Sequence, residues 1–477
     1  MSQCILIIKT SSFVSKIQKY GKVSKIPTKQ SQQWVEEDVG SLRHVNIDVC
    51  SRIDKANAQK WKFINECTDS KHLWSSINMK GEVKPDLHDD IPVESIASFC
   101  AKRSKIDISQ TLLDGITTDA VNHELDKDID KEEIEEALAD LNPNSKTNDG
   151  ITPNTVKSIL PTIITILISL FNLVLKGGPK AYPSNWLNFI NAIPKKGRLQ
   201  LPKFLRCISI MGIFEKLYQT ILNKRLYKFL KIPYAQTAYQ KLKGCNIHVM
   251  TIRLLKILTV KTKQKLFIIF TDFEAAFDLV SRRLLFEKLV KLGISAKLLN
   301  ALISIYIASQ SVVEHKGEFS DYVILLCGIK QGAPPSGILY IAYTLDIIKM
   351  YNNEFNPEPL LHLVHLLMHA DDILLLATSK SLAIQKLYAL MTYCKSNFIK
   401  LQLAKCAVLC VNSADINDHL PITVDGVVLE NKKEEVYLGS VITNSYRLID
   451  DVEADIRKRQ VNVIKFYAFL RSNSNTR

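Results

Sequence analysis

Apolar residues recur along the chain in patterns that predict first helices and then buried strands. Asp130-Lys131-Glu132-Glu133 has the form of a helix capping box, and apolar residues at 134, 137, 138 and 141 then form one helical face. A longer apolar run ends near Leu175, where Gly177-Gly178-Pro179 closes it. An amphipathic pattern then extends from Ile213 to Leu230. These patterns predict a mainly helical region.

The spacing of apolar residues changes after residue 265. Leu266 to Phe270 is wholly apolar, which is typical of a buried strand. Leu361–Met368 and Ile373–Ala377 are separated only by His369-Ala370-Asp371-Asp372, and two apolar runs joined by a short polar tip predict a hairpin. Helical patterns cover 281–292 and 381–397, so we expect an α+β fold with mixed strand pairing.

Basic residues are concentrated in one segment. Between Lys195 and Lys265 there are 17 Lys or Arg and one acid, Glu215, an excess larger than the net charge of +14 for all 477 residues. Such a segment indicates a polyanionic partner, and nucleic acid is preferred over an anionic membrane. A solvated basic surface would have the same composition.

The ten cysteines indicate an intracellular, reduced protein. No pair has the Cys-x-x-Cys spacing of a zinc or redox site, and Cys406 and Cys410 are expected to be core thiols. The N-terminus lacks the basic segment of a signal peptide. The apolar stretch from Ile163 to Leu175 is expected to be too short to span a membrane.

Three carboxylates fall at predicted strand ends. Asp272 lies two residues beyond the first apolar run, and Asp371 and Asp372 occupy the hairpin tip. Buried carboxylates need a cation, a hydrogen-bond donor or a metal. If the strands are neighbours in one sheet, the three acids converge and could hold two Mg²⁺ ions about 4 Å apart, an arrangement suited to phosphoryl transfer. A lone Asp-Asp pair in a turn would more often be simple turn chemistry.

A series of motifs, in order, resembles those of the reverse transcriptases of non-LTR (LINE-type) retrotransposons. Residues 270–278, Phe-Thr-Asp-Phe-Glu-Ala-Ala-Phe-Asp, look like the first palm motif, residues 328–336 like the Gln-Gly loop, and residues 369–372 like the Asp-Asp hairpin. Upstream, residues 193–196 and 206–209 are similar to fingers motifs, and residues 149–151 to an earlier signature. The resemblance covers about residues 115–470.

This resemblance implies a role for each matching residue. Metal ligands would be Asp272, Asp371 and the backbone carbonyl of Phe273, with Asp372 as a weaker ligand; the cofactor would be two Mg²⁺ ions, with Mn²⁺ as an alternative. Lys405 could protonate the pyrophosphate leaving group. Lys195, Lys196 and Arg206 would clamp the triphosphate, and Phe277 would be a gate against the ribose 2′-hydroxyl. Gln331 and Gly332 would form a loop that approaches the nucleotide or template. The primer grip would consist of His369, Tyr437, Leu438 and Gly439.

The sequence departs from the family's usual residues at several points. His369 stands where Phe or Tyr is common, and Lys330 replaces an Arg. Pro335 and Gly337 occupy positions where Leu and Pro are commoner. Gln402 replaces an Asn, and the segment around Tyr239-Gln240 lacks an expected Arg. None of these changes removes a catalytic carboxylate.

The implied fold is a right-hand polymerase with helical fingers, a ferredoxin-like palm and a short helical thumb. We expect a linker region at 1–115 that follows a missing endonuclease, fingers at 116–235, the palm at 236–425, and the primer grip with a truncated thumb at 426–477. The chain therefore looks like a fragment of an element. A nuclear location is expected, with the cytoplasm as the alternative.

The implied activity is RNA-directed DNA synthesis, with an RNA template, a DNA primer and dNTPs as partners and no membrane. Two alternatives stay open at this point. A catalytically silent, nucleic-acid-binding remnant would keep the basic segment without synthesis, and an RNA-directed RNA polymerase would also use paired aspartates, although Phe277 argues against it. The sequence makes no prediction of the oligomeric state.

Overall fold

The computed structural model describes residues 91–103, 113, 115–143, 145, 147–194, 205–307, 310–315, 317–358, 360–361 and 364–460. The chain divides into two units between Lys84 and Pro85, and all of the described residues belong to the second. The predictions for residues 1–90, which include most of the linker region, lie outside the described residues.

A four-stranded antiparallel sheet carries the predicted buried strands. Its order is β6-β7-β3-β8, formed by Leu366–His369, Asp372–Ala377, Leu266–Thr271 and Ala407–Val411. Helices lie between β3 and β6 and between β7 and β8, so the strands follow the β-α-β-β-α-β order of a ferredoxin-like fold. The predicted hairpin is confirmed, although its first strand begins at Leu366 rather than Leu361.

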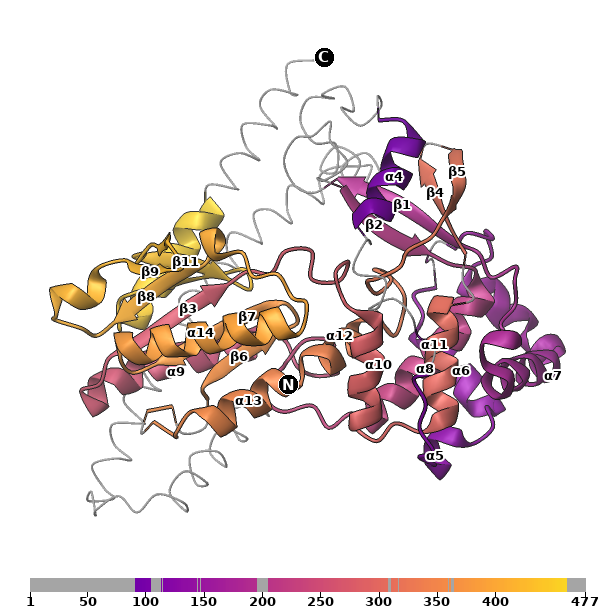
Figure 1. Cartoon of the computed structure of the whole chain (residues 1–477), viewed down its shortest axis with the longest axis horizontal. Helices are drawn as coiled ribbons and strands as arrows, with labels where there is room; N and C mark the ends of the chain where they lie inside the picture. The colour runs from indigo at the N-terminus through magenta and orange to yellow at the C-terminus, as the bar shows by residue number, and fades with distance from the viewer. Residues whose placement is uncertain are drawn as a thin grey trace, which may run out of the picture. The chain divides into compact units, whose positions relative to one another are not determined.

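Helices pack on both faces of this sheet. Alternate residues of β3 point to opposite faces, and every residue of β3 is buried, so each face needs an apolar cover. Helices α13 (Asp346–Glu354) and α14 (Lys380–Ser396) cover one face, and α14 crosses β7 and β3 in Figure 1. On the other face, α9 (Cys245–Thr262) packs against Leu266, Ile268 and Leu376.

Short backbone pairings cover both edge strands of the sheet. On β6, the N–H of Met368 donates to Ala235 and the carbonyl of Met368 accepts from Thr237. On β8, Val408 makes the same two bonds with Glu430 and Lys432. We call each of these pairs of bonds a backbone clamp. Each clamp includes a parallel bridge, between Gln236 and Met368 of β6 and between Asn431 and Val408 of β8.

A second four-stranded sheet was not predicted. Its order is β2-β1-β4-β5, formed by Leu205–Ile210, Asn188–Pro194, Ser311–His315 and Glu318–Val323. The fingers region is therefore not purely helical. Strand β1 pairs in parallel with β4, which lies beyond the proposed fingers–palm boundary at 235. Helix α4 (Val93–Arg103) packs on this sheet, where the Cys100 and Cys207 sulfurs lie 2.8 Å apart.

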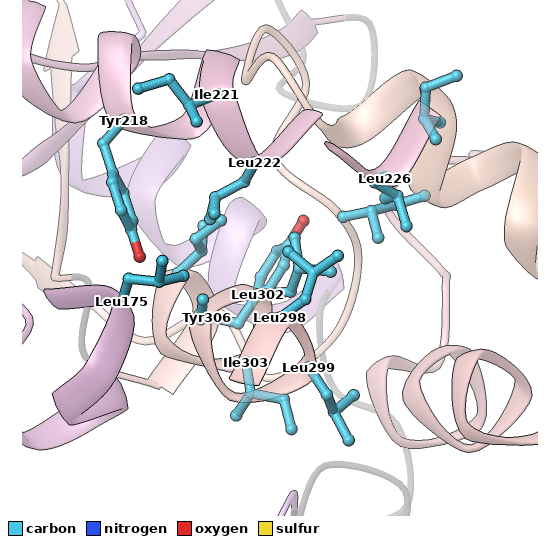
Figure 2. Close-up of a cluster of buried hydrophobic side chains, with 14 of the residues drawn as sticks. Leu175, Tyr218, Ile221, Leu222, Leu226, Leu298, Leu299, Leu302, Ile303 and Tyr306 are labelled. Carbon is cyan, nitrogen blue, oxygen red and sulfur yellow. The ribbon is translucent and has the colours of Figure 1, made fainter. Parts of the chain in front are cut away.

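The largest apolar core is helical. It joins α6 (Lys131–Asp140), α7 (Pro153–Gly177), α8 (Ile213–Phe229), α10 (Arg282–Lys291), α11 (Ala296–Ile307) and α12 (Ser336–Thr344), with the short α5 (His123–Asp126) beside them. Figure 2 shows side chains of α7, α8 and α11 meeting in this core, including Leu175, Tyr218, Leu222 and Leu302. The predicted capping of α6 is confirmed, because the Asp130 side chain accepts from the Glu133 N–H.

Two sequence features acquire a definite place in this core. Asp149, from the early signature at 149–151, accepts from the Ile213 N–H and so caps α8, and a Cβ on Gly212 would lie 2.8 Å from its carboxylate. Helix α7 is longer than the sequence indicated. The helical span Pro153–Lys180, which includes α7, is long and apolar enough by length and composition to cross a membrane, although the apolar stretch named above is only part of it. One face of α7, including Val156 and Phe171, is buried in the helical core.

Two small hairpins and a helix complete the described part of the chain. Strands β9 (Ile422–Val424) and β10 (Val427–Leu429) form the first hairpin, and β11 (Glu434–Tyr437) and β12 (Ser440–Thr443) form the second. A helix begins at residue 448 and is described to residue 460, within the region predicted to hold the primer grip and thumb at 426–477. Asp451 on this helix accepts from Lys256 of α9 at 2.6 Å, which ties the helix to the palm.

Candidate active site

The register of the palm sheet brings the three predicted carboxylates to one end of adjacent strands. Thr271, the last residue of β3, pairs with Ile373 of β7, so Asp272 leaves β3 beside Asp372, the first residue of β7. Asp371 lies in the two-residue turn between β6 and β7, after Ala370, whose φ of +57° is left-handed. Neighbouring strands are about 4.8 Å apart, so the acids share a small region.

The carboxylates repel one another. Burial, and then the negative charge of Asp272, raises the pKa of Asp371. Loss of water, together with the charges of Asp371 and Asp272, raises the pKa of Asp372 to about 6. A cluster of oxygen ligands that is unfavourable when fully ionised is suited to a hard divalent cation.

The donor set fits Mg²⁺ in chemistry, although the side chains are not gathered as a ligand shell. Among the described residues, no three His, Cys, Asp or Glu side chains lie together closely enough to hold an ion. The backbone beyond Asp272 is fixed by bonds from Gln402 N to Asp272 O and from Glu274 N to Lys400 O. Neither bond uses the carbonyl of Phe273, the predicted backbone ligand, which would complete an all-oxygen set with the carboxylates.

Lys405 is directed to the carboxylates. Its ammonium lies 3.0 Å from Asp272 Oδ2, and both side chains are partly exposed. A cavity of about 550 Å³ beside them is lined by Asp272, Asp372, Lys405, Lys432 and Tyr437. The cavity thus connects two of the carboxylates to the predicted primer grip.

Phe277 and the Gln-Gly loop pack together and form an aromatic wall with Tyr340 of α12. The ring of Phe277 stacks on Tyr340 of α12, with centroids 4.8 Å apart and planes at 12°. Its carbonyl accepts from Ile329 N at 2.9 Å, which fixes Phe277 to the loop before Gln331. The Gln331 side chain reaches Asp278 at 3.4 Å.

Only a glycine fits at position 332, because strand β2 lies too close for a side chain. Its φ is +103°, and a Cβ there would lie 2.7 Å from the carbonyl oxygen of Ser209 on β2. The backbone N–H of Ser209 also donates to the Gln331 carbonyl. The close approach that the glycine permits in this structure is therefore to β2, and the predicted contact of this loop with a nucleotide or template stays a prediction.

The predicted triphosphate clamp is described only in part. Arg206 is exposed on β2, and its positive charge opposes the rise in the pKa of Asp371, so the guanidinium acts on the carboxylate site. Lys195 and Lys196 lie outside the described residues.

The predicted primer-grip residues lie beside the β6–β7 hairpin that carries Asp371. Leu438 and Gly439 form the two-residue turn of the β11–β12 hairpin, with φ values of +47° and +86°. The buried Tyr437 ring stacks on His248 of α9, and its hydroxyl lies 3.0 Å from His248 Nδ1. Both ring nitrogens of His369 have neighbours, Thr237 Oγ1 at 3.0 Å and Cys245 Sγ at 3.5 Å.

Comparison with known families shows the family to which this chain belongs. The family model for "Reverse transcriptase (RNA-dependent DNA polymerase)" matches residues 193–442, just over half of the chain. The chain belongs to the reverse transcriptase family. The matched range contains every predicted site residue.

Two curated relatives are retrotransposon proteins. The reverse transcriptase is 25% identical over 223 residues to the Pol polyprotein of a type-1 R2 retrotransposable element of Popillia japonica, and 22% identical over 232 residues to that of the type-2 element R2DM of Drosophila melanogaster. These matches cover 46% and 49% of this chain, but only 30% and 22% of the relatives. The expected reverse transcriptase family is confirmed by the family match, and the chain spans less than a third of the length of these two retrotransposon proteins.

Solved structures similar to this reverse transcriptase include telomerases. The Candida albicans telomerase has 13% identity and a TM-score of 0.37, with 61% of this chain and 49% of that chain covered. The Candida tropicalis telomerase has 14% identity and a TM-score of 0.38, with 60% and 51% covered. The expected α+β class is confirmed by the mixed architecture and the family match.

Two buried residues near the site of the reverse transcriptase were missed in the sequence. The Gln236 side-chain oxygen accepts from the backbone N–H groups of Ala238 and Ala370, which holds the left-handed residue before Asp371. His248, 1% exposed, connects Tyr437 to the hairpin, since its ring lies 6.3 Å from that of His369. The sequence around Gln236 and His248 does not predict these contacts, because their partners are distant in the chain and meet only in the folded protein.

Substitution of Asp372 by Asn is expected to change how the stability of the reverse transcriptase depends on pH. In the folded protein the pKa of Asp372 is about 6, whereas its ordinary value is 3.8. As pH rises from about 4 to about 6, the unfolded chain loses this proton first, so the wild type loses stability relative to Asp372→Asn. Asp372 is exposed, so solvent screens its charge. The free energies of unfolding of the two proteins are therefore expected to differ by at most about 1 kcal/mol at pH 7.

Thermal unfolding of both proteins in metal-free buffer at pH 4 and pH 7 would measure this difference. The advantage of the Asn variant should be present at pH 7 and absent at pH 4. An advantage of the same size at both pH values would contradict the assigned pKa.

Proposed function

We propose that this chain is an RNA-directed DNA polymerase of a non-LTR retrotransposon, which adds deoxynucleotides to a primer 3′-hydroxyl. The observation that carries this proposal is the convergence of Asp272, Asp371 and Asp372 at one end of the central strands. The family match and the resemblance to R2 Pol polyproteins support the same activity.

Asp272 and Asp371 would hold two Mg²⁺ ions, with Asp372 and the Phe273 carbonyl as further ligands and Mn²⁺ as an acceptable substitute. When bound, the metals supply positive charge at the attacking and leaving oxygens of nucleotidyl transfer. Lys405 now neutralises Asp272 at 3.0 Å. Its ammonium is thus within reach of the region where pyrophosphate would leave, and it could donate a proton there.

The nucleotide would lie between the carboxylates and the wall formed by Phe277 and the Gln-Gly loop. Arg206, with Lys195 and Lys196, would bind the triphosphate, since a guanidinium matches two phosphate oxygens. The Phe277 ring, held by Tyr340, would exclude a ribose 2′-hydroxyl by steric clash. Gln331 and Gly332 would support the base pair from the loop that β2 braces.

The primer would enter along the cavity that joins Asp272 to Tyr437. The turn at Leu438 and Gly439 and the ring of His369 would position its 3′ end. The partners are then an RNA template, a DNA primer and dNTPs. The proposed location is the nucleus, where DNA targets of a retrotransposon lie, with the cytoplasm as the alternative.

Primer extension tests the proposed activity directly. A DNA primer annealed to an RNA template should be extended with dNTPs in Mg²⁺, and a chelator in excess of the metal should reduce extension to the level of buffer. Mn²⁺ should restore activity to the chelated and re-dialysed protein. Absence of extension in both metals, with the primer–template shown to be bound, would reject the proposal.

The basic segment from Lys195 to Lys265 favours a second candidate, binding of nucleic acid without synthesis. That function predicts salt-sensitive binding of RNA, because neutralised phosphates release counterions. It also predicts that Asp371→Asn leaves the only activity unchanged.

A further inference from the structure

Tyr239 lies against the wall that contains Phe277. The two rings meet edge to face, with centroids 6.4 Å apart and planes at 75°, while Tyr340 stacks on Phe277. A Cβ on Gly337 would lie 2.5 Å from the Tyr239 ring. The ring therefore occupies space that exists only because residue 337, on α12, has no side chain.

The backbone holds Tyr239 in an unusual conformation. Its φ is +52°, a left-handed value that bulky residues rarely adopt, and such residues are concentrated at functional sites. The flanking bonds maintain it. Gln236 Oε1 accepts from Ala238 N at 2.9 Å, and the Gln240 side chain donates to the Gln236 carbonyl at 2.5 Å.

The same segment is attached to the catalytic hairpin. Gln236 Oε1 also accepts from Ala370 N at 3.2 Å, one residue before Asp371. The Tyr239 side chain is 53% exposed, and after partial burial the negative charge of Asp371 further raises the pKa of its hydroxyl. Tyr239 is therefore near both Asp371 and the Phe277 ring, and it is partly open to solvent.

We propose that Tyr239, seated on Gly337, is a positioning residue that holds Phe277 in place and thereby sets the preference for deoxynucleoside over ribonucleoside triphosphates. This inference rests on the proposed polymerase function. Phe277 makes the steric contact with the sugar. Tyr239 limits how far the Phe277 ring can turn or retreat when a 2′-hydroxyl presses on it.

The pairing of Tyr239 with Gly337 makes the proposal specific to this chain. Proline is commoner at position 337 in the family that the motif resembles, and any side chain there would displace the Tyr239 ring. Gly337→Ala is therefore expected to act in the same direction as Tyr239→Ala. Since both changes remove one contact, the double variant should lose no more than either single variant.

The test is the ratio of kcat/KM for a dNTP to kcat/KM for the matching rNTP, on one RNA template and DNA primer. Tyr239→Ala and Gly337→Ala should each lower this ratio by about 10-fold, the scale of discrimination by a small apolar contact. Tyr239→Phe keeps the ring and should retain the wild-type ratio. Phe277→Ala is the reference variant and should lower the ratio most.

The control is Tyr234→Ala, because Tyr234 is 90% exposed on the same segment. Its ratio should equal that of the wild type. If Tyr239→Ala keeps the wild-type ratio while Phe277→Ala loses it, the inference is wrong and the polymerase function stands. If Tyr239→Ala and Tyr234→Ala instead weaken RNA binding equally with unchanged ratios, Tyr239 is a template contact and the inference is also wrong.

Two outcomes separate folding and function from the inference. If Tyr239→Ala fails to fold, Gly337→Ala still tests the proposal, because a side chain at 337 would displace the Tyr239 ring. An unchanged ratio in Gly337→Ala would then overturn the proposal. Absence of dNTP incorporation by the wild type, in contrast, would reject the proposed function itself.

Discussion

Asp371→Asn is expected to reduce primer extension by at least about 10²–10³-fold, the loss seen when one group that stabilises transition-state charge is removed. Asn keeps the size of the side chain but removes the negative charge that a divalent cation needs. Asp371 lies at the hairpin tip beside Asp272, so the change would affect both proposed metal positions. The rate should be measured in single-turnover extension at saturating Mg²⁺.

Asp425→Asn provides a matched control for Asp371→Asn. Asp425 also lies in a two-residue hairpin turn, between β9 and β10, with a φ of +47°, and it is exposed. Asn tolerates this conformation, so its rate should equal that of the wild type. Equal rates for the two variants would mean that Asp371 has no part in catalysis.

Asp451→Ala is expected to destabilise the junction of the palm and the C-terminal helix by about 3–5 kcal/mol, because it leaves a buried charge without its partner. Lys256 and Asp451 are both 0% exposed, and their charged atoms lie 2.6 Å apart. Asp451 also accepts from the backbone N–H and the hydroxyl of Thr443. Burial lowers the pKa of Lys256, but Asp451 opposes this shift while it is present.

Urea denaturation followed by circular dichroism would measure the loss. The double variant Lys256→Met/Asp451→Leu should recover most of the stability, because it removes both buried charges. Glu434→Gln is the control, since its ion pair with Arg457 is exposed on both sides and should contribute less than about 1 kcal/mol. A loss below that value for Asp451→Ala would show that Lys256 can reach water without it.

The palm could be predicted from the sequence because its strands are unusually apolar. Every residue of β3 is buried, and the two runs around the hairpin tip are equally continuous, so local pattern and final environment agree. The second sheet could not be predicted in this way. Strand β5, Glu-Phe-Ser-Asp-Tyr-Val, has only two buried residues, and β1 finds its partner β4 more than 100 residues away.

The carboxylates could also be predicted, since their motifs occur in order along the chain. What the sequence did not reveal is how they are held. Gln236 and Ala370 are 134 residues apart, and the contact of Tyr239 with Gly337 depends on the same long-range packing. Gly332 was expected near a substrate, but its φ and its approach to Ser209 have a cause within the protein.

The backbone clamps on β6 and β8 have a consequence for how the protein behaves at high concentration. An unpaired edge strand is a template for adding strands from other molecules, which leads to aggregates. Here Ala235–Thr237 and Glu430–Lys432 already occupy part of each edge. A recombinant piece limited to residues 266–411 would expose both edges, and so it should precipitate where the longer chain stays in solution.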